Sequence, residues 1–363
     1  MTPSIVKKTS PYIRKETSTK RMMFDVLIAL TPVTFFSIYK YGLDALVRIL
    51  ISLVVFILTE LIYFLATTKV EGYTFKEKLQ AKFKKYSINH FSAPAVSGLI
   101  YAMLLPDKLS LYVVFMGALF GAFVGKMIFG GLGYNIFNPA ALGRVFIAVT
   151  FAGFFQGSYG FVDQTSGATA LSMGFPNAFN AYQLTDLFVG NIPGAMGEVH
   201  SLLILVGAIY LIIRKSADFR PMVSALVIFT VLTTIAGIIL YPYHVVEYVL
   251  FHLLSGGLLF GLAFMVTDPV TSPITRPGRW YYGLIIGTLI FMIRTFGALP
   301  EGVAFAILIA NVLVPIIDYP RWATNRFTKK FFLTYGLSFA LICVISFLVL
   351  GGYTIWQQQK LKN

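Results

Sequence analysis

The stretch SLYVVFMGALFGAFVGKMIF, residues 110–129, decides the fold class of this chain. It carries a single charged residue, Lys126, and has the length of roughly 20 residues that an α-helix needs to cross a bilayer. Gly117, Gly121 and Gly125 recur at every fourth position, and small residues at this spacing let two helices approach closely. The stretch therefore predicts a membrane-spanning helix with a closely packed helical neighbour.

Apolar segments of this kind recur along the whole chain. Hydrophobic residues make up 57% of the 363 residues and charged residues only 12%, whereas ordinary soluble domains carry about 25% charged residues. We count eleven apolar segments, at residues 22–40, 43–67, 92–106, 110–129, 139–156, 201–213, 222–241, 247–266, 280–297, 301–318 and 331–351. We therefore expect an all-α, polytopic integral membrane protein with about ten transmembrane helices, some of them broken or re-entrant.

The positive charges are unevenly distributed. The net charge is +14, and 21 of the 29 Lys and Arg residues lie in five blocks, at residues 7–21, 69–85, 214–220, 276–279 and 321–330. No Lys or Arg lies between Arg144 and Arg214. Short loops rich in Lys and Arg stay in the cytoplasm and favour contact with anionic lipids. The charge therefore indicates a lipid bilayer as the partner and argues against nucleic acid.

This charge pattern predicts the orientation of the chain. Residues 1–21 form a cytoplasmic N-terminal segment, residues 22–351 the membrane domain, and residues 352–363 a C-terminal tail. Within the membrane domain, we expect a cytoplasmic linker at 68–91 and an outer loop at 157–200. Part of the linker, residues 76–85, could be an amphipathic helix on the membrane surface or a plain solvated loop.

Two polar segments interrupt the apolar chain. Gly130-Gly131-Leu132-Gly133-Tyr134-Asn135-Ile136-Phe137-Asn138-Pro139 cannot be regular helix, and irregular backbone at membrane depth must line a cavity or be covered by protein. Asn135 and Asn138 could bind a polar ligand or cap the next helix. Asp268, in the second segment, could bind a cation, cap a helix or pair with an arginine. The similarity of the two segments indicates possible repeated halves with a site between them.

Charged residues within the apolar segments are candidates for an ion path. Lys126 and Arg144 are such candidates, together with Asp268. Arg48, Glu60 and Arg294 also lie within apolar segments, and mutual pairing of these charges would give them a structural role instead.

The longest polar interruption, residues 157–200, contains the segment DQTSGATAL at 163–171. Asp163, Ser166, Gly167, Ala168 and Thr169 occupy the fixed positions of the pattern Asp-x-x-Ser-Gly-Ala-Thr. The threonine hydroxyl could carry a covalent cofactor, although Ser-Gly is also a common turn dipeptide.

This pattern resembles the flavinylation motif of a family of membrane subunits that includes RnfD of the Rnf complex and NqrB of the sodium-pumping NADH:quinone reductase (Nqr). Segments 130–139, 267–273 and 300–308 also resemble this family. The resemblance implies that a flavin transferase joins FMN through its phosphate to Thr169, on the outer face. It also implies a noncovalent riboflavin near Asn135 and Asn138. By the same resemblance, Asp163 would be recognised by the transferase or help hold the transferase's metal ion.

The resemblance further implies an electron-relay subunit of an ion-translocating oxidoreductase, a translocase in the cytoplasmic membrane of a bacterium or archaeon. The short segment before the first span favours the Rnf complex, which couples ferredoxin and NAD electron transfer to Na⁺ or H⁺ transport. Its partners would include the FMN-bearing RnfG and the membrane proteins RnfA and RnfE. NqrB and a non-redox transporter remain alternatives. No catalytic acid–base residues are expected, because the flavin supplies the redox chemistry.

Overall fold

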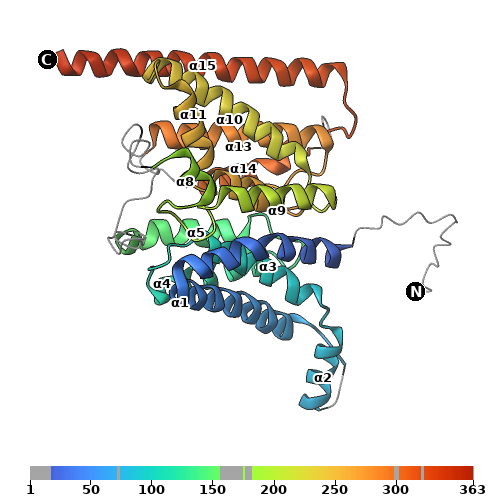
Figure 1. Ribbon diagram of the computed structural model, residues 1–363. Coiled ribbons are helices and arrows are strands. Elements are labelled where there is room, and N and C mark those ends of the chain that lie inside the picture. Colours follow the sequence, from blue (N-terminus) through green and yellow to red (C-terminus); the bar gives the residue numbers. More distant parts are fainter. Residues whose placement is uncertain are drawn as a thin grey trace.

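The computed structural model describes residues 18–71, 74–155, 175, 182–297, 302–319 and 323–362. All regular secondary structure within these residues is helical, as the sequence predicts. Figure 1 shows two tiers, with α1 to α5 forming the lower tier and α9 to α15 the upper one. The N-terminal half of the described chain therefore lies in the lower tier and the C-terminal half in the upper tier.

Helix α1 (Thr19–Thr67) contains two of the predicted spans. It bends at Gly42, where φ is 63° and ψ is −140°, a backbone conformation that glycine adopts far more readily than other residues. The bend separates the two predicted segments 22–40 and 43–67. Helix α3 (Asn89–Met103) packs against the second of them, because a Cβ atom added at Gly98 would lie 3.0 Å from the Ser52 carbonyl oxygen.

Helix α4 (Leu111–Ala122) continues into a π-helical turn at Phe123–Met127. The next helix, α5 (Pro139–Thr150), packs closely against it and is followed by a 3₁₀ turn at Ala152–Phe155. A Cβ atom at Gly121 would lie 2.5 Å from the Pro139 carbonyl oxygen. The close helix approach predicted from the glycine spacing is confirmed.

The upper tier contains α9 (Ser201–Ile213), α10 (Phe219–Leu240), α13 (Arg276–Phe296) and α14 (Val303–Ile317). Helices α10 and α13 pack against each other, and α15 (Lys329–Lys362) lies along the outside of the tier (Figure 1). Helix α15 continues through residues 352–362, the segment that the sequence predicts as a tail.

The sequence predicts one span at 247–266. The prediction is wrong in its continuity, because the structure breaks this span into α11 (Val245–Leu254) and α12 (Leu258–Phe264). The two parts meet at an angle of 48°. Gly256 and Gly257 have φ of 62° and 60°. Arg294 donates hydrogen bonds to the carbonyls of His252, at 2.7 Å, Ser255, at 3.2 Å, and Gly256. A cation thus satisfies carbonyl groups that an unbroken helix would have bonded internally.

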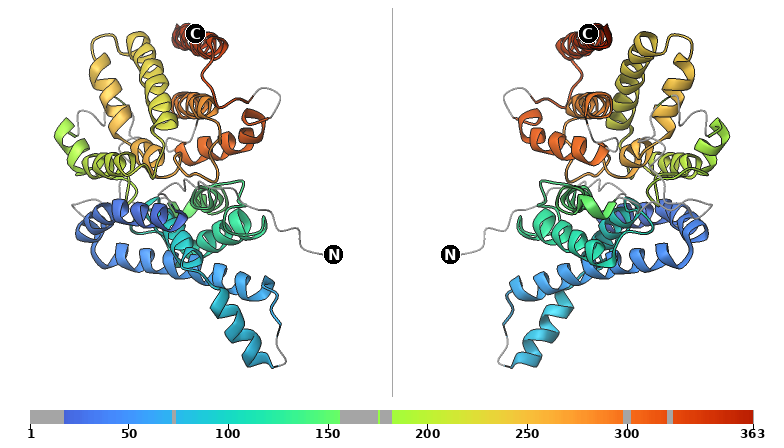
Figure 2. Two further views of the ribbon diagram at one scale, coloured as in Figure 1. Left: turned by 90° about the vertical axis from the view of Figure 1, so that its right-hand side faces the viewer. Right: turned by 90° about the vertical axis from the view of Figure 1, so that its left-hand side faces the viewer.

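Residues 75–85 form a helix, which decides between the two alternatives for the basic linker. Helix α2 (Phe75–Lys85) has a capping box between Thr74 and Glu77 and projects from the rest of the molecule (Figure 2). Phe75 and Phe83 are exposed beside its lysines. Its composition is that of an amphipathic helix at a membrane surface.

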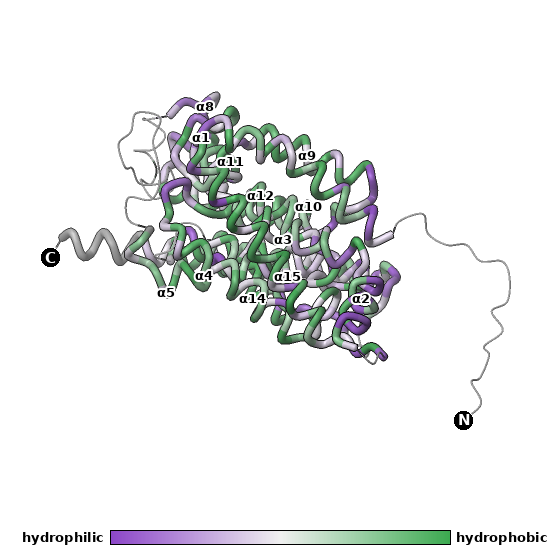
Figure 3. Tube along the Cα trace, turned by 90° about the horizontal axis from the view of Figure 1, so that it is seen from below, coloured by the Kyte–Doolittle hydropathy of each residue, from purple (hydrophilic) through white to green (hydrophobic). Residues whose placement is uncertain are grey.

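Helix length and composition agree with a polytopic membrane protein. Helices α1, α10 and α15 are long and apolar enough to cross a bilayer, and the bent pair α11–α12 passes the same test when taken together. Other apolar helices are shorter. Hydrophilic residues gather around α2 at one end and α8 (Leu184–Val189) at the other, with hydrophobic residues between them (Figure 3).

Candidate functional site

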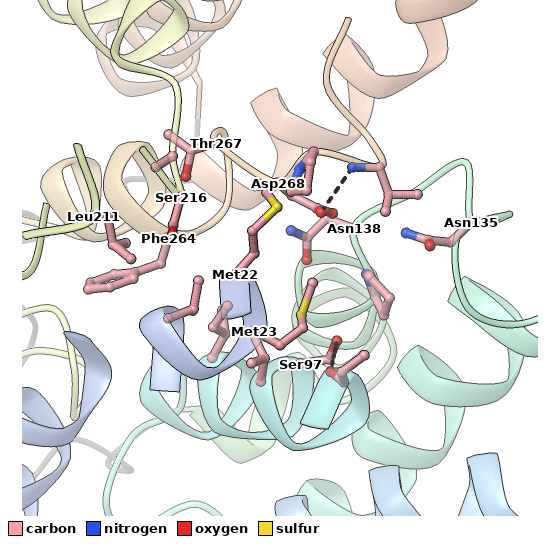
Figure 4. Close-up of a pocket in the computed structure, with 18 of the residues that line it drawn as sticks. Met22, Met23, Ser97, Asn135, Asn138, Leu211, Ser216, Phe264, Thr267 and Asp268 are labelled. Carbon is pink, nitrogen blue, oxygen red and sulfur yellow. Dashed lines mark hydrogen bonds between the residues drawn. The ribbon is translucent and has the colours of Figure 1, made fainter. Parts of the chain in front are cut away.

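The two polar interruptions meet at a cavity between the tiers. The cavity encloses about 70 Å³, which is room for a few water molecules and well below the roughly 300–1,000 Å³ typical of small-molecule sites. Its polar lining includes Lys126. It also includes Asn135, Asn138 and Asp268, which are labelled in Figure 4. Its wall is largely apolar, with contributions from Met22, Met23, Val26, Val96, Ile100, Leu211 and Phe264. Apolar walls with a few polar groups suit an organic ligand that has a flat ring and a polar edge.

The loop before α5 is shaped by glycine. Gly130, Gly131 and Gly133 have φ of 115°, 91° and 87°, which L-residues with side chains rarely adopt. These turns bring Asn135 to the cavity wall, where its Nδ2 donates to the Phe137 carbonyl oxygen at 3.1 Å. The predicted irregular backbone is confirmed.

Asn138 caps a helix and also lines the cavity. Its Oδ1 accepts hydrogen bonds from the backbone N–H groups of Ala140, at 3.1 Å, and Ala141, at 3.3 Å, and Pro139 occupies the first helical position. This is the capping role that the sequence left open. The side chain also lines the cavity, so a role in ligand binding stays a prediction.

Asn311 joins the two polar segments that interrupt the apolar chain. Its Oδ1 accepts from the Asn138 N–H at 3.1 Å, and its Nδ2 donates to the Thr271 carbonyl oxygen at 3.1 Å and to the Tyr282 hydroxyl at 2.7 Å. Asn311 is 1% exposed. Its role was not predicted from the sequence, although it is the only amide side chain in the apolar run of α14.

Asp268 provides a carboxylate at the cavity wall. Its Oδ1 accepts from the Val270 N–H at 3.2 Å and its Oδ2 from the Thr271 hydroxyl at 3.0 Å. The sequence left open whether Asp268 caps the local backbone or pairs with an arginine. In the structure, Asp268 caps the turn that it begins. No cluster of three or more His, Cys, Asp or Glu residues that could hold a metal ion occurs in the described part of the chain.

Lys126 lies in the π-helical turn and forms a buried ion pair. Its Nζ is 2.5 Å from Glu60 Oε2, and His90 Nδ1 is 3.4 Å from the other oxygen of the same carboxylate. Glu60 is 2% exposed and Lys126 is 3% exposed. The sequence left two roles open for these charged residues, an ion path or mutual pairing. The structure shows that Lys126 and Glu60 pair. Lys126 also lines the cavity, so the pair connects the cavity to α1.

Arg144 does not line the cavity. Its Nε donates to the Leu104 carbonyl oxygen at 2.9 Å, beyond the end of α3. Arg48 likewise donates from Nε to the Leu109 carbonyl oxygen at 2.8 Å. The structure therefore brings together Lys126, Asp268 and the two asparagines, and places Arg144 elsewhere.

The predicted attachment motif, Asp163, Ser166, Gly167, Ala168 and Thr169, lies outside the described residues. Phe175, six residues after Thr169, is described. Its ring centroid lies 4.8 Å from that of Tyr241, and its carbonyl oxygen accepts from the Tyr241 hydroxyl at 2.9 Å.

Phe175 lies at the opposite end of α10 from the basic residues 214–220. Tyr241 directly follows the last residue of α10, whereas Arg220 is the second residue of this helix. A helix of 22 residues is about 33 Å long, close to the hydrocarbon thickness of a bilayer. The aromatic contact and the basic block are thus separated by about one bilayer.

Comparison with known proteins gives a consistent result. The family model described as "NQR2, RnfD, RnfE family" matches residues 6–326. The chain is 33% identical over 354 residues to the NqrB protein of a Na⁺-translocating NADH-quinone reductase from Chromohalobacter salexigens, covering 87% of this chain and 85% of that protein. It is 30% identical over 374 residues to the protein of the same name from Haemophilus influenzae strain PittEE, covering 88% of each.

Proposed function

Because the chain belongs to the NQR2, RnfD, RnfE family, we propose that it is a membrane electron-relay subunit of an ion-translocating oxidoreductase, carrying FMN on Thr169. The curated relatives named above are subunits of a Na⁺-translocating NADH-quinone reductase, which supports a role in such a complex. Partner subunits and a flavin transferase follow from this assignment.

The motif at 163–169 carries the proposal. A phosphoester between FMN and the Thr169 oxygen would attach a redox group to a chain whose own side chains offer no comparable electron carrier. Gly167 and Ala168 are small, so a transferase could approach the backbone closely.

The opposite placement of Phe175 and the basic block supports the proposed orientation. Lys- and Arg-rich loops stay in the cytoplasm, so the end of α10 near Tyr241 belongs on the outer face. We accordingly place Thr169 outside the cytoplasmic membrane of a bacterium or archaeon, and residues 68–91 inside.

The chemistry of the cavity lining supports a second, noncovalent flavin such as riboflavin, and the cavity would have to widen from its volume of about 70 Å³ to admit it. Asn135 and Asn138 contribute amide groups, which can both donate and accept hydrogen bonds, and Lys126 contributes an ammonium group at the same wall. The apolar wall could hold the ring and keep water away from it. Asp268 supplies the cavity's carboxylate and is the group that we propose a translocated cation would meet.

Two complexes of this family are candidates, and different observations favour each. The Rnf complex, with RnfG, RnfA and RnfE as partners, is the expectation from the sequence, whereas both curated relatives described above belong to the NADH-quinone reductase. Activity in membranes separates them. Loss of ferredoxin:NAD electron transfer on deleting the gene indicates Rnf, and loss of NADH:quinone activity indicates the reductase.

Thr169→Val tests the flavin attachment, because it removes the oxygen and keeps the shape of the side chain. The chain is expressed with its flavin transferase, denatured, and examined for in-gel flavin fluorescence and intact mass. Thr169→Val should lose both the fluorescence and the mass increment of FMN. Thr165→Val is the matched control, four residues upstream in the same loop, and should retain both.

Two results would contradict the proposal. Fluorescence that persists in Thr169→Val would place the attachment on another residue. A wild-type chain that carries no flavin in the presence of the transferase would favour the non-redox transporter.

A further inference from the structure

A strongly basic cleft lies at the end of the bundle where α10 and α13 begin. It encloses about 610 Å³ and is lined by Lys215, Arg220, Arg276 and Arg279, with Asp218 as the acidic residue among them. Four cations against one carboxylate leave a net charge of +3. The cleft therefore concentrates positive potential at one end of the membrane domain.

Asp218 leaves most of this charge unmatched. Arg220 Nη1 lies 2.6 Å from Asp218 Oδ2, and Arg279 Nη1 donates to the same oxygen. Arg279 also donates from Nε to the Pro273 carbonyl oxygen at 2.9 Å. Each guanidinium has five N–H donors, so one carboxylate cannot use the donors of two arginines. The two side chains are held in place with donors left for an anion.

The helix termini add to the positive potential. Arg220 lies in the first turn of α10, and Arg276 and Arg279 in the first turn of α13, and neither first turn contains an acidic residue. The N-terminal end of a helix carries a partial positive charge, so cations there are disfavoured unless an anion is nearby. Asp218, the N-cap of α10, and Asp318, whose carboxylate accepts hydrogen bonds from Thr275 at the N-cap of α13, offset part of this charge. Three arginines at the two helix ends remain against these two carboxylates.

The backbone conformation at Lys215 also supports a functional role for the positive charge in the cleft. Lys215 has φ of 58° and is the only residue other than glycine with a positive φ among the described residues. It follows the end of α9, where glycine is the usual residue in this conformation. A lysine at a position that favours glycine adds charge to the cleft at the expense of local backbone preference.

We propose that this cleft binds the phosphate-bearing headgroup of an anionic phospholipid. Basic pockets at the cytoplasmic ends of transmembrane helices suit such headgroups. Apolar residues of the same lining, among them Met22, Ile212 and Phe219, offer an adjacent surface for acyl chains, which a free phosphate ion would not need.

The position of the cleft gives the bound headgroup a structural consequence. The cleft shares Met22, Ser216, Ala217, Thr267 and Pro269 with the lining of the inner cavity. A headgroup in the cleft therefore lies beside the mouth of that cavity and neutralises the positive charge there. This inference does not depend on whether the cavity holds a flavin.

The test uses the full-length chain in a neutral detergent, titrated with phosphatidylglycerol and followed by native mass spectrometry. Lys215 and Arg276 are exposed, so the double variant Lys215→Gln/Arg276→Gln removes charge with little effect on packing. We expect phosphatidylglycerol to bind roughly 30-fold more weakly to this variant, from the usual contribution of two basic residues near a lipid surface. An unchanged thermal unfolding midpoint would confirm that the variant is folded.

Two control variants make the comparison specific. Lys76→Gln/Lys78→Gln removes the same charge from α2, whose lysines are exposed at another basic block, and should bind like the wild type. Lys215→Arg/Arg276→Lys keeps the charge and should also retain binding. Equal binding by the cleft variant and the wild type would overturn the proposal.

The ligands distinguish the source of the phosphate. Phosphatidylcholine, which carries no net charge, should bind more weakly than phosphatidylglycerol, and equal binding of the two would refute an anion site. Inorganic phosphate should not displace phosphatidylglycerol at equal concentration. If it does, a soluble phosphate is the ligand, and the lipid assignment is wrong.

Discussion

Replacing Lys126 with methionine would leave the buried Glu60 carboxyl group without its closest partner. The two side chains are 4% and 3% exposed, and their charged atoms are 2.5 Å apart. At an effective dielectric constant of about 20, a pair at this separation attracts by roughly 7 kcal/mol. Removing both ions from water costs several kcal/mol each, so the net value of the intact pair is small.

Removing one partner of the ion pair costs more stability than replacing both partners with apolar residues. Loss of one partner leaves an uncompensated buried charge, and such losses typically cost about 3–5 kcal/mol. His90 lies 3.4 Å from the other Glu60 oxygen and can offset part of this cost, so we expect Lys126→Met to fall at the lower end, near 3 kcal/mol. The double variant Lys126→Met/Glu60→Leu should recover most of the lost stability.

The free energy of unfolding can be measured by titrating the purified chain in mixed micelles with a denaturing detergent. Lys78→Met is the matched control, because it makes the same change at an exposed position on α2 and should cost less than about 0.5 kcal/mol. A Lys126→Met variant as stable as this control would refute the reasoning, as would a double variant less stable than either single one.

Three further predictions concern the upper tier and the orientation of the chain in the membrane. Asn311→Leu should lower the free energy of unfolding by about 3 kcal/mol, since several buried hydrogen bonds are lost, and the same detergent titration measures this. Burial alone would raise the pKa of Asp218, but the Arg220 N–H and the Arg279 guanidinium outweigh it and lower that pKa. Asp218 therefore stabilises the fold above about pH 4 and loses this effect as the pH falls further, so thermal midpoints of the wild type and Asp218→Asn should converge only in acid. In a cysteine-free background, an impermeant thiol reagent should label Tyr243→Cys and not Ser87→Cys in intact cells, and the reverse pattern would invert the topology.

The helices themselves were largely predictable from the sequence. Apolar segments of sufficient length must form helices in a bilayer, because every backbone polar group has to be satisfied internally. The glycine-rich interruption at 130–138 was predictable for the same reason, since its residues cannot continue a helix.

The contacts that fix the site were not predictable, because they join residues far apart in the chain. Asn138 meets Asn311 across 173 positions, and Lys126 meets Glu60 across 66. Local sequence contains no record of such pairs. The break within 247–266 was missed for a similar reason, since the arginine that stabilises it lies on α13 and the glycines alone do not require a bend.

That break also limits where an ion can travel. Carbonyl groups released at a broken transmembrane helix are the ligands that transported cations commonly use. At the end of α11, three of these carbonyls accept hydrogen bonds from Arg294, whose charge is permanent. A fixed guanidinium acts as an electrostatic barrier to cations and protons, as it does in selective pores. A cation at the α11–α12 junction would therefore meet a guanidinium in place of carbonyl ligands, so under the function that we propose the ion would take another route.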